Sequence, residues 1–139
     1  MMVSLQDIKK SFYTFRNGII ADTLRKAGMP YKVIFGLQIP QIAAIAREQQ
    51  PSIELADTLW EDKDVRESRI LATYLYPREE VTEEKALELL RSVVTPEESD
   101  MLAFRLLKHL PFVAELADKI ENDPQIPAYA VASLKRHLS

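Results

Sequence analysis

Basic side chains gather toward both ends of the chain, and their chemistry suits the binding of phosphate groups. They are Lys9, Lys10, Arg16, Arg25, Lys26, Lys135, Arg136 and His137. Lys and Arg hold phosphate oxygens through charge-assisted hydrogen bonds, as in contacts to a nucleic-acid backbone. The same residues also suit a solvated helix face, because cations near the end of a helix complement its dipole. Both interpretations stay open at this point.

Net charge limits how far such contact extends along the chain. The 139 residues carry a net charge of −3. Residues 1–28 contain five basic and two acidic residues, whereas residues 52–100 contain six basic and fourteen acidic ones. Affinity for a phosphate backbone depends on clustered Lys and Arg. The acidic middle therefore argues against one broad phosphate-binding surface and leaves room for a local basic patch.

The sequence lacks the residues that several other kinds of functional site require. The sequence has no cysteine, which excludes disulfides and thiolate metal sites. Its two histidines, His109 and His137, are far apart and have no nearby ligand spacing, so we expect no metal site. No phosphate-binding glycine loop, Rossmann glycine pattern or Ser/His/Asp order is present. We therefore expect no cofactor.

Length and composition fit one compact domain over residues 1–139. Hydrophobic residues make up 47% of the chain and only three residues are glycine, which favours helix over sheet. The N-terminus has no apolar run behind its charges, and no apolar stretch approaches the roughly 20 residues that span a membrane. These features favour a soluble, cytoplasmic protein.

Start and stop signals divide the chain into eight or so short helices and no convincing strand. Ser4, Ser52, Thr82 and the pair Thr95-Pro96 are expected N-terminal caps or first positions. We expect the first helix to run from Ser4 to Ala27 with Gly18 inside it, because Ile8, Phe12, Phe15 and Ile19 recur at helical spacing and form an apolar core stripe. Gly28 then ends that helix.

Two further local predictions concern the connector and the central helix. Residues 31–39 are expected to form a turn of helix and a connector, since no later segment is expected to pair with them as a strand. Asp64 is expected to cap the next helix, with Glu67 completing a capping box. Trp60 is expected to pack in the core. The series of short helices predicts an all-α fold, an α-α superhelix of helical repeats, with an irregular bundle as the competing architecture.

Two stretches resemble known families. Asp64-Val65-Arg66, followed by Ala72 and Leu75, looks like a HEAT-repeat helix. Over residues 30–110 the order of features resembles the DNA alkylation repair family of HEAT-like alkylpurine DNA glycosylases. The resemblance is carried by Phe35-Gly36-Leu37-Gln38-Ile39-Pro40 with Ile42-Ala43, by Leu59-Trp60, and by Glu67-Ser68-Arg69 with Ala72.

The resemblance implies a HEAT-like superhelix that holds duplex DNA on its concave face and cleaves the N-glycosidic bond of alkylated purines. It places the family's catalytic aspartate at Asp100, near the start of a helix. Pro96 stands where the family has a tryptophan, and no arginine opens the helix that begins at Pro127. The expected DNA-binding residues are Arg66, Arg69, Arg105, Lys108 and Arg136.

Each of these residues also has a structural interpretation. A carboxylate at position 100 is favourable near a helix start without any catalysis. Glu67 and Arg69 suit a cap and an ion pair as well as a lining of the concave face. Two functions therefore remain: a DNA-repair relative that binds duplex DNA or excises alkylated purines, and a non-catalytic helical-repeat module that binds a protein partner on its concave face.

Overall fold

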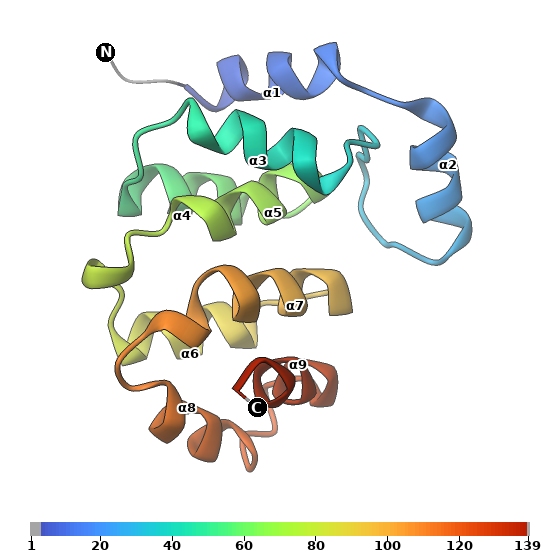
Figure 1. Cartoon of the computed structure of the whole chain (residues 1–139). Helices are drawn as coiled ribbons and strands as arrows, with labels where there is room; N and C mark the ends of the chain where they lie inside the picture. Colours follow the sequence, from blue (N-terminus) through green and yellow to red (C-terminus); the bar gives the residue numbers. More distant parts are fainter. Residues whose placement is uncertain (1–3, 139) are drawn as a thin grey trace. The chain divides into compact units, whose positions relative to one another are not determined.

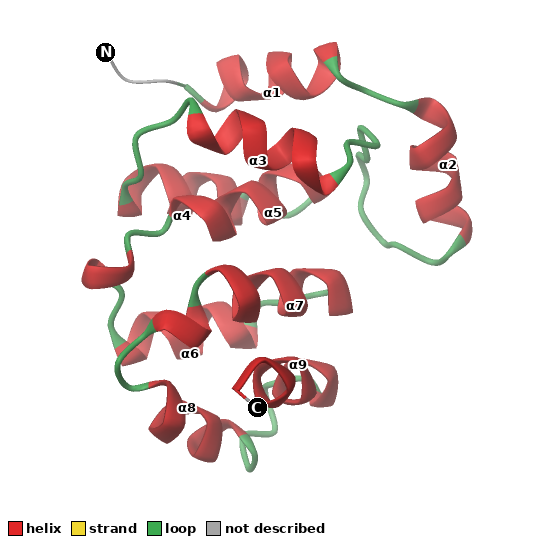
Figure 2. Cartoon of the chain, viewed as in Figure 1, coloured by secondary structure: helices red, strands yellow, loops and turns green. Residues whose placement is uncertain are grey.

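The computed structural model describes residues 4–138 of the chain. Within these residues the regular structure is helical (Figures 1 and 2), and the all-α prediction is confirmed. The α-helices are α1 (Leu5–Thr14), α2 (Gly18–Lys26), α3 (Ile39–Arg47), α4 (Ile53–Glu61), α5 (Arg66–Leu75), α6 (Glu83–Arg91), α7 (Pro96–Arg105), α8 (Val113–Ile120) and α9 (Ala128–Leu138). Two short 3-10 helices are η1 (Arg78–Glu80) and η2 (Leu107–His109).

The helices fall into two compact units, Met1–Leu75 and Tyr76–Ser139. In the first unit α5 packs against α3 and α4, and the core includes the fully buried Phe12, Leu37, Leu59 and Ile70. In the second unit α7 packs against α9 and η2, while α8 packs against α6 and α9. That a single domain spans residues 1–139 stays a prediction.

Local start signals account for most of the helix boundaries. The hydroxyls of Ser4, Ser52, Thr82 and Thr95 each accept a backbone N–H from the first turn of the following helix, as predicted. Gly28 follows Ala27, the C-cap of α2, and has a φ of 100°, a conformation that glycine adopts without steric cost. These hydrogen bonds satisfy backbone groups that helix ends leave open.

The prediction of one helix from Ser4 to Ala27 is wrong, because the chain breaks at Asn17. The Asn17 side chain accepts hydrogen bonds from the N–H groups of Ile19 and Ile20, at 3.0 and 3.1 Å. Its own N–H donates to the carbonyl of Phe35 at 2.8 Å. Gly18 therefore opens α2 rather than lying inside a helix, and Ile19, expected in the core stripe, is 82% exposed.

Replacing Asn17 with alanine should lower the free energy of unfolding by about 1–2 kcal/mol, since the cap of α2 is lost. Urea denaturation followed by the fluorescence of Trp60, the only tryptophan, measures the change in the first unit. Asn17→Asp and Asn17→Ser keep a capping oxygen and serve as matched controls. Equal losses in all three variants would show that the cap is not what the side chain contributes.

Residues 27–38 form an irregular connector between α2 and α3 (Figure 2), so the expected turn of helix there is absent. Contrary to the expectation from the sequence, the connector pairs with a later segment of the chain. Val33 forms an isolated parallel bridge with Val65: its N–H donates to Asp64 O at 2.9 Å, and its carbonyl accepts from Arg66 N at 3.2 Å. The connector is thereby tied to the start of α5.

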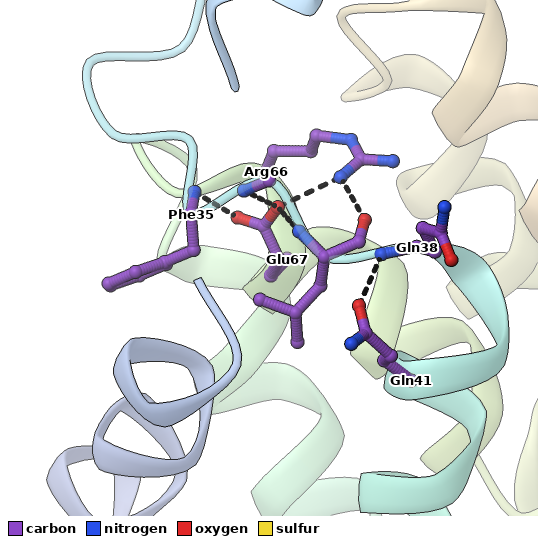
Figure 3. A network of polar contacts seen from close by, with 7 residues as sticks. Phe35, Gln38, Gln41, Arg66 and Glu67 are labelled. Carbon is purple, nitrogen blue, oxygen red and sulfur yellow. Dashed lines mark hydrogen bonds and ion pairs between the residues drawn. The ribbon is translucent and has the colours of Figure 1, made fainter. Parts of the chain in front are cut away.

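The predicted capping box at Asp64 and Glu67 is also wrong. Helix α5 begins at Arg66, and the Asp64 side chain lies half-exposed beside Lys32. The Glu67 carboxylate is fully buried and accepts the backbone N–H groups of Phe35, Gly36 and Leu37 at 3.0, 3.1 and 3.3 Å (Figure 3). Glu67 thus caps the connector, some 30 residues earlier in the chain, instead of its own helix.

Candidate functional site

The carboxylate of Asp100 lies where two helices of the second unit meet. Thr95 caps α7 and Pro96 occupies its first turn, so Asp100 follows one turn later on the same helix. From the last turn of α9, Arg136 Nη2 contacts Asp100 Oδ1 at 2.9 Å and His137 Nε2 contacts the same oxygen at 2.8 Å. The packing of α7 on α9 brings these residues together across more than 35 positions of sequence. Asp100 remains 46% exposed.

The ionised form of Asp100 is favoured in the folded protein. Burial raises the pKa of this carboxyl, but the hydrogen bonds and positive charge of Arg136 and His137 outweigh burial and hold the pKa below its usual value. At neutral pH the site therefore presents a carboxylate, which accepts hydrogen bonds and stabilises nearby positive charge but does not act as a general acid.

This shift makes a small part of the stability depend on pH. A lowered folded-state pKa contributes stability that is complete above the unfolded-state pKa of about 3.9 and is lost as pH falls through the folded value. Because Asp100 is half-exposed, we expect the contribution to stay below about 1 kcal/mol. Urea denaturation at pH 6 and pH 3 measures it: the wild type should lose more stability between these values than Asp100→Asn. Equal losses would contradict the expected ion pair.

An exposed aromatic ring lies beside this carboxylate. Phe104, one turn after Asp100 on α7, has its ring centroid 5.4 Å from that of His137. Lys108 Nζ lies 4.0 Å from the centroid of the same ring. We call Asp100, Phe104, Lys108, Arg136 and His137 the Asp100 cluster. It combines a carboxylate, an apolar ring and cations on adjoining parts of α7, η2 and α9.

The structure brings together three of the predicted site residues: Asp100, Lys108 and Arg136. Arg105, the last residue of α7, is half-buried, and its carbonyl accepts a hydrogen bond from Arg78 at 3.5 Å. Phe104 was not foreseen as a site residue, since an apolar residue in a helix is usually assigned to the core. His137 was noted only as part of a basic strip, and its contact with Asp100 depends on tertiary packing.

Arg66 and Arg69 lie in the first unit and are both only 3% exposed. Arg66 Nη1 donates to Glu67 and to the carbonyl of Leu37, each at 2.8 Å (Figure 3). Arg69 donates to the carbonyl of Trp60 at 2.7 Å, and its guanidinium lies 3.8 Å from the centroid of a Trp60 ring. These contacts give both arginines structural roles, and we do not carry them into the proposed DNA-binding surface.

The connector that Arg66 and Glu67 hold is tightly packed at Gly36. This glycine has a φ of 86°, and a Cβ added there would lie 2.1 Å from the carbonyl oxygen of Asn17. Beyond it, Gln38 and Gln41 bond to each other at the start of α3 (Figure 3). The residues Phe35 to Pro40, which are part of the family resemblance, therefore have a structural role in the first unit.

Within residues 4–138, no group of three or more His, Asp or Glu side chains is arranged to hold a metal ion. Over the same residues, every helix is too short or too polar to cross a membrane.

The family model described as DNA alkylation repair enzyme matches residues 8–125. The chain belongs to this family. The DNA alkylation repair family is a helical-repeat fold, which agrees with the predicted fold class. The matched residues include Asp100 and Phe104 of the cluster and end before Arg136 and His137. No curated protein and no solved structure matches the chain.

Proposed function

We propose that this member of the DNA alkylation repair family binds duplex DNA and excises alkylated purines, with Asp100 as its catalytic carboxylate. The single observation that carries the proposal is the geometry of the Asp100 cluster. An ionised, half-exposed carboxylate is held by two basic side chains next to an exposed aromatic ring. The family membership supplies the substrate class.

The chemistry that such a site supports follows from the substrate. A purine alkylated at N3 or N7 already carries a positive charge, so it leaves with the electrons of the N-glycosidic bond without a strong general acid. Positive charge then develops on the deoxyribose, where a fixed carboxylate stabilises it. Water adds at C1′ and gives up a proton, for which Asp100 is the acceptor. Products are the free alkylated purine and an abasic site.

The remaining residues of the cluster have supporting roles. The ring of Phe104 offers an apolar surface to the sugar or the lesion. The Arg136 side chain is 62% exposed and suits a bidentate contact to a phosphate, which would leave His137 as the fixed partner of Asp100. Lys108 adds a further positive charge beside the ring. We therefore propose Lys108, Arg105 and Arg136 as DNA-binding residues.

Release of 7-methylguanine or 3-methyladenine from methylated duplex DNA tests the proposal. The wild-type protein should release base faster than the same DNA incubated without protein. A protein that binds the duplex in a gel-shift assay without releasing base would be a DNA-binding relative and not an enzyme. No release and no binding would exclude both forms of the proposal.

A second candidate function is a non-catalytic module that binds a protein partner. It is favoured by the exposed apolar side chains of Tyr13, Phe15 and Ile19, which lie at and around the break between α1 and α2 in the first unit. Exposed large apolar side chains are common at protein interfaces. The DNA experiments above separate this function from the first.

A further inference from the structure

A second group of basic side chains lies next to the Asp100 cluster. It consists of Arg78 in η1, Arg105 at the end of α7, and Lys108 and His109 in η2, and we call it the cationic corner. Arg78 Nη2 donates to the carbonyl of Arg105 at 3.5 Å, which joins η1 to the end of α7. Arg78 and His109 are exposed, whereas Arg105 and Lys108 are half-buried.

The other cations of the corner act on the pKa of His109. Burial lowers the pKa of His109, and the positive charges of Arg78, Lys108 and Arg105 lower it further, while a backbone hydrogen bond with Phe104 acts in the opposite direction. Glu79 and Glu80 follow Arg78 in η1, and their carboxylates are not among the groups that shift the pKa of His109. The charge that His109 experiences from its neighbours is therefore positive.

Other cations of the second unit are arranged differently. Arg91 forms an ion pair with Asp123, Lys119 with Glu83, and Lys135 with Glu121. In the corner, by contrast, Arg78 donates to a carbonyl and Lys108 lies over the Phe104 ring, and neither contact supplies a negative charge. Cations that gather in this way raise the local potential and favour an anionic ligand.

The corner adjoins the proposed site through one side chain. Lys108 belongs to both groups, because it lies over the Phe104 ring, and that ring also contacts His137, the partner of Asp100. A strand that places its deoxyribose at Asp100 and Phe104 therefore runs next to the corner. The spacing of a strand puts a phosphate near each sugar, so an anion of the right class is present wherever the strand continues.

We propose that Arg78, Arg105, Lys108 and His109 bind one phosphodiester of the DNA strand that carries the alkylated purine, close to the lesion. The inference rests on the proposed function, since it assumes that Asp100 marks the position of the damaged nucleotide. Its consequence is that the corner fixes the register of the strand. The proposal adds Arg78 and His109 to the DNA-binding residues, although neither was a DNA-binding candidate from the sequence.

The first test is the salt dependence of binding to a short duplex with a single 7-methylguanine. Each phosphate contact contributes to the slope of log affinity against log salt concentration. Arg78→Gln and Lys108→Gln should each weaken binding and reduce that slope, by at most about 1 because the corner holds a single phosphate. Lys119→Gln is the matched control, because it removes the same charge from another exposed position of the same unit, and it should leave the slope unchanged. Unchanged slopes in both corner variants would overturn the proposal.

The second test locates the phosphate on the DNA. Neutral methylphosphonates replace the phosphates near the lesion one at a time, and binding is measured with the wild type and with Arg78→Gln. One position should weaken wild-type binding and have little further effect on the variant, since the two changes remove the same contact. Additive losses at every position would overturn the proposal.

The two tests also separate this inference from the proposed function. A wild type that binds DNA with the expected slopes but releases no base would disprove excision and leave the phosphate site standing. Base release that persists while the corner variants keep the full salt slope would disprove the phosphate site alone. Free inorganic phosphate at equal ionic strength should compete only weakly with the duplex, and strong competition would identify a free-phosphate site instead.

Discussion

Replacing Glu67 with alanine is expected to lower the free energy of unfolding by about 3–5 kcal/mol, because it removes one partner of a buried ion pair. The carboxylate is fully buried and accepts three backbone N–H groups of the connector as well as Arg66 Nη1 (Figure 3). Its removal leaves the buried N–H groups of Gly36 and Leu37 without their acceptor. A buried donor that loses its acceptor costs about 1–3 kcal/mol even before charge is considered.

Urea denaturation followed by Trp60 fluorescence measures this loss where it occurs. Trp60 is 5% exposed in the first unit, so its emission reports that unit directly. Glu61→Ala is the matched control, since the same change at an exposed position of the same unit should shift stability by less than about 0.5 kcal/mol. Glu67→Gln keeps the shape but turns an NH₂ group toward donors, so it should lie between the two. A Glu67→Ala protein as stable as Glu61→Ala would refute the structural role.

Glu67 also shows what the sequence could not reveal about the fold. Asp64 and Glu67 have the spacing of a local capping box, and nothing in the neighbouring residues argues against one. The actual partners, Phe35 to Leu37, lie about 30 positions earlier and are brought close only by tertiary packing. The caps at Ser52, Thr82 and Thr95 were predictable because both donor and acceptor lie within one turn.

The break at Asn17 is a second feature that depends on tertiary contacts and that the local sequence did not predict. The apolar residues Ile8, Phe12, Phe15 and Ile19 have the spacing of a single helix. The Asn-Gly pair at positions 17 and 18 is a local signal for a break, but it is weaker evidence than this periodicity. The break is fixed by a hydrogen bond from Asn17 to Phe35 and by the close approach of Gly36, both of which are tertiary. Periodicity therefore predicted that these residues are helical but not where the chain turns.

The candidate site was accessible from the sequence only through the resemblance. Asp100 was proposed from its place in the family pattern. That pattern also has an arginine at the start of a later helix, and this chain has none where the helix begins at Pro127. In the structure Arg136 reaches Asp100 from the last turn of α9, because α7 packs along α9. Charge and composition left room for a local basic patch, whereas the pairing of specific side chains required the coordinates of both helices.

Asp100→Asn is expected to reduce the rate of alkylpurine release by about 10²–10³-fold, the usual cost of removing a group that stabilises transition-state charge. Each tenfold loss corresponds to about 1.4 kcal/mol of transition-state stabilisation. Asparagine keeps the size of the side chain and an oxygen that accepts from Arg136, but it carries no negative charge for the developing cation. The effect should appear in single-turnover release of 7-methylguanine from duplex DNA, after subtraction of spontaneous depurination.

Binding and chemistry separate cleanly in this variant. Neutralising Asp100 frees Arg136 from its ion pair, so affinity for the duplex should stay the same or rise while the rate of release falls. Asp123→Asn is the matched control: it removes a carboxylate that pairs with Arg91 in the same unit but lies outside the Asp100 cluster, and it should release base at the wild-type rate. Full activity of Asp100→Asn, or an equal loss in Asp123→Asn, would assign the chemistry to another residue. A loss confined to Asp100→Asn with binding intact is the result that only a catalytic carboxylate produces.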